Sequence, residues 1–264
     1  MKTVVPRIRR GYPTVGRVID NSFRHTNQHS VPDSCHPSHY TSAPDDALAL
    51  LHAADHVSTE PHLPIAMDND GVSGADTIQR LSAIPWCCAL LESPQWTRTR
   101  TSSRVPKAST EDALFAETLA TQRTIRSCTA LRPTEESTIG EGEACYDELR
   151  VIYEIGEGVS GWPKIAHGGF VVTLLDESIG MLLQLNLGLK IEKGVRPIEG
   201  ANVFTAYLNT TYKKPVPAPA TVLCTVRLIR RERNKLYLRA TVEDGQGTLF
   251  TIGDAMFVEV KSKI

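Results

Sequence analysis

The feature that most constrains the fold is a long apolar segment, residues 168–187, whose few polar residues recur at helical spacing. A helix that is apolar around most of its surface is buried, because it would otherwise expose hydrocarbon to water. The exceptions share one face, since residues three and four apart are helix neighbours. They are Thr173, Asp176, Glu177, Gly180 and Gln184. The segment therefore predicts a central helix with one narrow polar line.

The segments on either side of this helix have the pattern of β-strands. Residues 145–155 alternate apolar and polar side chains, as expected of a strand with one buried face. Four strand-like runs follow the helix at residues 201–212, 221–229, 235–243 and 248–260, separated by Pro- or Gly-containing turns. Strands joined by short turns pair antiparallel, and the apolar helix needs a cover. We therefore predict an α+β domain with one curved antiparallel sheet wrapped around the central helix.

The chain changes character before this domain. Residues 1–74 are rich in Pro, Ser, His and Asp, and we expect a disordered N-terminal extension. Residues 75–130 are expected to form a helical accessory segment, in which Pro85 kinks or interrupts a first helix. A second helix is predicted after residues 109–112, whose acids suit a first helical turn. The compact domain is then expected over residues 131–264.

Composition argues against several classes of function. A formal net charge of −1 does not suit a general nucleic-acid binder, which needs surplus Lys and Arg. No run of 18 apolar residues occurs, so we expect no membrane span. The six cysteines include no C-x-x-C pair, which indicates reduced thiols in an intracellular, cytoplasmic protein. The basic first 24 residues leave a mitochondrial transit peptide open as an alternative.

The histidines are distributed unevenly. The N-terminal part holds a cluster of potential zinc ligands, namely His25, His29, Cys35, His36 and His39. Their spacing matches no standard zinc site, so we expect no metal and no other cofactor. His167 is the only histidine after residue 62, and hence the only imidazole in the predicted domain.

The start of the central helix predicts an anion-stabilising site. His167-Gly168-Gly169 places free backbone N–H groups at the positive end of the helix dipole, which suits an oxyanion. Further along, the carboxylates of Asp176 and Glu177 are unfavourable on a buried helix unless they are paired, hydrated or used. The alternative is that both simply face solvent at a helix edge.

Helix geometry relates these two features. Asp176 follows His167 by nine residues, which places it about 13 Å along the axis and about 180° around it. One helix therefore cannot bring its own start and its own Asp176 to the same carbon atom. Two antiparallel helices related by a two-fold axis can do so. If both groups are catalytic, the working unit is at least a dimer.

Residues 167–176, His-Gly-Gly-Phe-Val-Val-Thr-Leu-Leu-Asp, resemble the hotdog-fold thioesterase superfamily. The closer likeness is to the phenylacetate-pathway type and its eukaryotic acyl-CoA thioesterase relatives. In that family an HGG tripeptide opens the central helix and an acid follows nine positions after the His. The likeness continues in residues 205–217 and 253–259 and covers about residues 143–260.

This resemblance implies a hotdog fold and the hydrolysis of an acyl thioester, either acyl-CoA or acyl-carrier protein, by a homodimer or a dimer of dimers. Asp176 would activate water as a general base, or act as a nucleophile. The N–H of Gly168 would contribute to the oxyanion hole, and Thr205 would position water or substrate. His167 would orient the helix start or contact the thioester.

The candidate substrate-binding residues are Gly169, Glu177, Lys213 and Lys214. The two lysines could meet the phosphates of coenzyme A, or they could be ordinary solvated turn residues.

The sequence departs from the family's pattern in two places. Gly161 stands where many relatives carry an amide side chain six residues before the His, and the segment 188–201 is long. Two other functions therefore remain open. One is release or editing of a carrier-bound acyl or polyketide chain in a biosynthetic pathway. The other is a non-catalytic acyl-thioester-binding protein.

Overall fold

The computed structural model describes residues 74–138, 144–194 and 201–261, all of which belong to one compact unit, Thr59–Ile264. The predicted N-terminal extension and its histidine cluster lie outside these residues, as do residues 195–200 of the segment 188–201.

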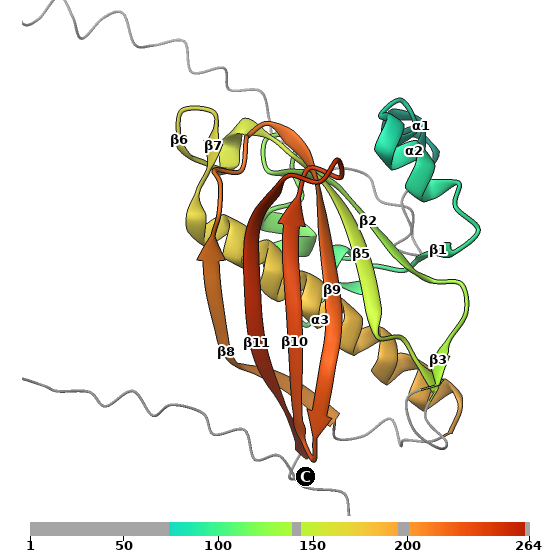
Figure 1. Cartoon of the computed structure of the whole chain (residues 1–264). Helices are drawn as coiled ribbons and strands as arrows, with labels where there is room; N and C mark the ends of the chain where they lie inside the picture. The colour runs from blue at the N-terminus through green and yellow to red at the C-terminus, as the bar shows by residue number, and fades with distance from the viewer. Residues whose placement is uncertain (1–73, 139–143, 195–200, 262–264) are drawn as a thin grey trace, which may run out of the picture. The chain divides into compact units, whose positions relative to one another are not determined.

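The described domain is built on a seven-stranded antiparallel sheet with the order β1-β2-β5-β9-β10-β11-β8 (Figure 1). The strands are β1 (Trp96–Thr99), β2 (Ile125–Pro133), β5 (Glu148–Ile155), β8 (Ala201–Tyr212), β9 (Ala220–Glu232), β10 (Lys235–Glu243) and β11 (Leu249–Lys261). The strands predicted at residues 201–212 and 235–243 have these bounds in the structure. The strand predicted at residues 221–229 lies inside β9. The strand predicted at residues 248–260 agrees with β11 to within one residue at each end. The run predicted at residues 145–155 divides into β4 (Ala144–Cys145) and β5.

The predicted central helix is α3 (Gly168–Glu192), which crosses one face of the sheet (Figure 1). It contacts β5, β8, β9, β10 and β11. Leu174, Leu175 and Ile179 of this helix are fully buried in the main core, and Phe170, Met181 and Leu185 pack against that core while partly buried. Length and composition alone would allow α3 to cross a membrane, but half of its most apolar window is buried inside the domain, as in a core helix.

Helix α3 lies in the sequence between β5 and the run of strands β8, β9, β10 and β11, with only short elements between β5 and the helix, so one sheet encloses one helix. This arrangement confirms the predicted α+β hotdog fold. Strand β8 forms one edge of the sheet.

Two short helices cover the other face of the sheet. They are α1 (Ala75–Ser82) and α2 (Pro85–Leu91), and Pro85 opens the second of them, as its fixed φ favours. Leu81 and Cys87 pack with Ile152 of β5 in a second hydrophobic cluster. The neighbours of Ile152, Val151 and Tyr153, belong to the main core that contains α3. The sheet is therefore buried on both faces at this end, because successive side chains of a strand point to opposite faces.

The structure differs from the predicted division of the chain at residue 131. Residues 75–130 contain β1 and most of β2, both of which extend the sheet beyond β5. In β2 every residue from Ser127 to Leu131 is buried, so the strand lacks the polar alternation that marks a half-buried strand. The accessory segment is thus part of the sheet and not only a helical cover.

The second predicted accessory helix is reduced to one π-type turn, η3 (Leu114–Thr118). Thr110 and Asp112 have φ values of 64° and 61°, so the backbone cannot become helical before Ala113. The remaining short elements are η2 (Ser102–Arg104), β3 (Ser137–Thr138), η4 (Glu157–Val159), β6 (Ser160–Trp162) and β7 (Ile165–Ala166).

Candidate active site

The start of α3 is capped by the imidazole of His167. Its Nδ1 accepts a hydrogen bond of 3.0 Å from the N–H of Gly169, and the His167 N–H donates to the Val159 carbonyl. An accepting Nδ1 carries no proton, so the capping imidazole is the Nε2–H tautomer. Gly169 was predicted to bind substrate, but its N–H serves this cap. The N–H of Gly168, in the first helical turn, has no intrahelical acceptor and is the donor best placed for an anion.

A second group at the helix start, Tyr212 at the end of β8, was not among the predicted site residues. Its hydroxyl donates a hydrogen bond of 3.0 Å to the carbonyl of Gly168. A Cβ on Gly168 would lie 3.2 Å from that hydroxyl, which explains why a glycine suits this position. Tyr212 therefore fixes the peptide that follows Gly168 and ties the helix start to the sheet edge.

The structure brings Asp176 and Thr205 together, as the predicted site requires. The Thr205 hydroxyl donates a hydrogen bond of 2.9 Å to Asp176 Oδ1, and Thr205 itself is exposed on the edge strand. A β-bulge at Ala206 creates this arrangement, since Thr205 pairs with Phe257 while Tyr207 pairs with Met256. Thr205 and Val203 therefore face the helix. Because the bulge inserts one residue, Leu208 also faces the helix further along the strand.

The two halves of the predicted site remain apart within one chain. Helix α3 is continuous from Gly168 to Glu192, so the separation of about 13 Å between its start and Asp176 applies. Asp176 lies on the polar face of the helix beside an edge strand that has no further strand beyond it among the described residues.

Glu177 lies in a different environment from its neighbour. Its Oε1 is shielded from solvent and has no hydrogen-bond partner among the described residues. Burial raises the pKa of the Glu177 carboxyl to about 7; Ser103 and Arg104 oppose the rise, while Asp112 and Asp176 add to it. Glu177 therefore has a buried carboxyl influenced by residues of the accessory turn η2, whereas Asp176 bonds Thr205.

Lys213 and Lys214 meet the helix start at a groove of about 370 Å³. The groove is lined by both lysines together with Gly168, Tyr212 and residues of β7 and the 215–216 turn. The N–H groups of both lysines donate to the Phe250 carbonyl, which fixes the backbone of this turn on β11. The predicted lysines thus lie beside the predicted oxyanion donor.

Gly161, the departure from the family's pattern, packs against His167. A Cβ at position 161 would lie 2.8 Å from His167 Cδ2 and 2.9 Å from its Cα. Any larger residue there would displace the capping imidazole. His167 therefore occupies the space that a side chain at 161 would need.

No group of three or more potential metal ligands occurs in residues 74–138, 144–194 and 201–261. The geometry defines a hotdog domain with a capped helix start on one side and an exposed Asp–Thr pair on the other.

Sequence comparisons agree with this class. The thioesterase superfamily pattern matches residues 164–251. An acyl-coenzyme A thioesterase of Mus musculus, THEM4, is 30% identical over 110 residues, which are 41% of this chain and 42% of the relative. Verlamelin biosynthesis protein B of a Lecanicillium species is 24% identical over 166 residues, or 55% of this chain and 71% of that protein. The chain thus spans less than half the length of the mouse relative.

Solved structures show weaker similarity. The smu.793 protein of Streptococcus mutans, bound to acetyl CoA, is 17% identical with a TM-score of 0.37, covering 45% of this chain and 85% of that one. The PaaI protein of E. coli is 10% identical with a TM-score of 0.36, covering 44% and 74%. The fold assignment rests on this chain's own strand order. Over residues 164–251 the chain is similar to the thioesterase superfamily.

Proposed function

We propose that the protein hydrolyses acyl thioesters at sites shared between two copies of the chain. Asp176 of one copy activates a water molecule, and the Gly168 N–H of the other copy stabilises the oxyanion. The observation that carries this proposal is the hydrogen bond from Thr205 to Asp176 Oδ1 on the exposed edge of the domain. That bond occupies one carboxylate oxygen and leaves Oδ2 to accept a proton from water.

The reaction then follows from the two groups. The water oxygen attacks the thioester carbonyl carbon while its proton passes to Asp176, and the carbonyl oxygen becomes an oxyanion near the Gly168 N–H. The C–S bond then breaks, and the leaving thiolate takes the proton from Asp176. The products are a carboxylic acid and a free thiol.

The edge strand β8 supports a two-fold dimer. It is 12 residues long and exposes Phe204, Tyr207 and Tyr212, with exposed fractions of 57%, 41% and 54%. A long apolar edge strand is a hazard for aggregation unless another strand covers it. Pairing β8 with β8 of a second copy would continue the sheet and set the two α3 helices antiparallel, as the separated site halves require.

Coenzyme A fits the groove at the helix start, because Lys213 and Lys214 could pair with its phosphates. The name of the mouse relative supports an acyl-CoA substrate for this chain as well. The second candidate, an acyl chain held by a carrier protein in a biosynthetic pathway, is supported by the name of the Lecanicillium relative.

The test is release of free thiol from short, medium, long and aromatic acyl-CoAs and from the matching acyl-carrier proteins. Asp176→Asn should lower turnover at least about a hundredfold, because the amide cannot accept the proton. Glu192→Gln, an exposed acid near the end of the same helix, is the matched control and should leave turnover unchanged. Binding of acyl thioesters without turnover of any substrate would exclude the hydrolase and favour a binding protein.

A further inference from the structure

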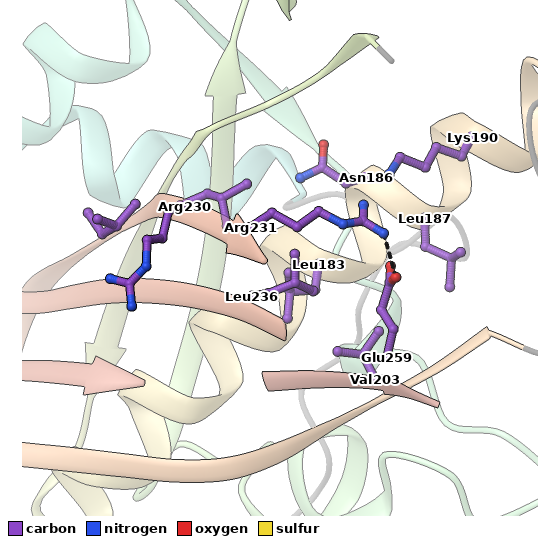
Figure 2. Close-up of a pocket in the computed structure, with 11 residues that line it drawn as sticks. Leu183, Asn186, Leu187, Lys190, Val203, Arg230, Arg231, Leu236 and Glu259 are labelled. Carbon is purple, nitrogen blue, oxygen red and sulfur yellow. Dashed lines mark hydrogen bonds and ion pairs between the residues drawn. The ribbon is translucent and has the colours of Figure 1, made fainter. Parts of the chain in front are cut away.

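A second cavity, of about 120 Å³, lies along the C-terminal half of α3. Its aliphatic lining comes from the helix and from β8, β9 and β10 (Figure 2). The lining residues of this kind are Leu183, Leu187, Val203, Leu228, Ile229 and Leu236. Such a lining suits a hydrocarbon group.

Helix α3 connects this cavity to Asp176. Residues seven and eleven positions apart differ by about 20° around a helix axis, so Leu183 and Leu187 share the face of Asp176. Gly180 lies between Asp176 and Leu183 along the helix, about 40° from Asp176 around the axis, and a Cβ added there would meet no atom within 4 Å. The space beside Gly180, between Asp176 and the cavity along the helix, is therefore open.

Strand β8 leads in the same direction. Val203 and Thr205 are two residues apart and lie on one face of the strand, ahead of the bulge at Ala206. Thr205 binds Asp176, and Val203 lines the cavity. Two elements distant in the sequence thus join the same carboxylate to the same cavity.

The polar groups around the cavity already have partners. Arg231 Nη2 lies 2.6 Å from Glu259 Oε2, a pair that joins β9 to β11 beside Leu183 and Leu236 (Figure 2). Arg230 pairs with Glu232, and the Asn186 amide bonds the backbone of Tyr146. Lys190 also has an interaction of its own. An apolar chain end therefore fits this cavity better than a charged one.

The spacing along α3 sets the length of that chain. Leu183 and Leu187 lie about 10 Å and about 16 Å beyond Asp176 along the helix axis. An extended hydrocarbon advances about 1.3 Å per carbon, given C–C bonds of about 1.5 Å. A carbonyl at Asp176 would therefore place roughly the eighth to thirteenth carbons in the cavity. The volume is below the roughly 150 Å³ of a cavity that holds benzene, which favours a slender alkyl end over a ring.

We propose that this cavity binds the distal end of a saturated acyl chain of about 8 to 14 carbons. The protein then selects medium-chain acyl thioesters over acetyl and aromatic ones. This inference rests on the proposed function only in placing the thioester carbonyl at Asp176.

Binding of S-alkyl-coenzyme A thioethers tests the cavity separately from catalysis, because a thioether has no carbonyl to hydrolyse. Calorimetry on the full-length chain should show a Kd that falls about fourfold per buried methylene and levels off near 14 carbons. A parallel series of acyl-CoA substrates should show kcat/KM rising over the same range.

Two variants change the volume of the cavity in opposite directions. Val203→Phe fills it and should weaken binding of the ten-carbon and longer thioethers about tenfold, while the two-carbon thioether stays within about twofold. Leu187→Ala enlarges it and should shift the optimum to chains longer by about two or three carbons. Val260→Phe and Leu189→Ala are the matched controls outside the cavity lining, and neither should change the chain-length profile.

The outcomes separate the two proposals. Hydrolysis that depends on Asp176, together with binding that is independent of chain length, would overturn the cavity inference and leave the proposed function standing. Binding that depends on chain length and changes as expected in both variants, without any hydrolysis, would support the cavity inference and reject the proposed hydrolase function. A preference for aromatic or acetyl groups would also contradict the inference.

Discussion

Thr205 of the edge strand and Asp176 of the central helix are joined by a hydrogen bond of 2.9 Å, in which the threonine hydroxyl is the donor. The pair lies beside β8, the edge strand of the sheet formed by the described residues. The bond orients the carboxylate before any substrate binds, and in the mechanism proposed above this orientation would lower the reorganisation that proton transfer needs.

The first prediction concerns this bond. Thr205→Val keeps the shape of the side chain but removes the hydroxyl, so Asp176 loses its fixed orientation. We expect kcat to fall about tenfold with KM changed less than about threefold, since the bond orients the base and not the substrate. Thr205→Ser should restore most of the activity. Equal loss in the serine and valine variants would show that the hydroxyl is not what matters.

The second prediction tests whether sites are shared. Asp176→Asn and Gly168→Pro should each inactivate the protein, the latter because proline lacks the N–H. Proline is tolerated in the first turn of a helix, and His167 has the extended ψ of 134° that a following proline prefers. Mixed and re-associated at equal concentration, the two inactive variants should recover about one quarter of wild-type activity, because one intact site forms in each heterodimer. No recovery despite proven subunit exchange would place both groups in one chain's site.

The third prediction concerns the sheet edge. Phe204→Glu places a charge on the exposed face of β8 and should shift the protein to monomers, as measured by light scattering, with loss of thioesterase activity. Leu114→Glu, at a side chain with a similar exposed fraction of 51%, is the matched control and should leave the assembly unchanged. A fully active monomer would contradict the shared-site mechanism.

The fold was predictable where periodicity is strong, and the site only in part. Helix α3 has a nearly continuous apolar surface, and β8 to β11 are separated by clear turns, so their order and bounds follow from the sequence. Strand β2 was missed because it is buried on both faces and shows no alternation. Tyr212 lies within the matching stretch 205–217, but nothing in that stretch predicts its bond to the Gly168 carbonyl. The bulge that aims Thr205 at Asp176 depends on the β8–β11 register. Glu177 and Asp176 are neighbours in sequence, yet burial raises the pKa of the Glu177 carboxyl, while Thr205 bonds Asp176.

The fourth prediction follows from the raised pKa of Glu177. Its carboxyl titrates near pH 7 in the folded chain, against a usual value of 4.5, so the folded state holds more protons between these pH values. Stability should therefore fall as pH rises from about 4.5 to about 7. Glu177→Gln mimics the protonated form and should be more stable than wild type by about 2 kcal/mol at pH 8, with no difference at pH 4. Urea unfolding at fixed protein concentration measures this, and a pH-independent difference would show that Glu177 is not buried as described.

The fifth prediction uses the contact between Gly161 and His167. Gly161→Ala would bring a methyl group within 2.9 Å of the His167 backbone, so the cap on the Gly169 N–H must shift or break. We expect a loss of about 1–3 kcal/mol in stability from overpacking, and a fall in kcat of at least about tenfold because the helix start moves. Gly188→Ala is the matched control, since a Cβ there meets no atom within 4 Å and alanine favours the helix. If Gly161→Ala keeps full kcat at a lower stability, the orientation of His167 has no part in the reaction. The imidazole would then be only a helix cap.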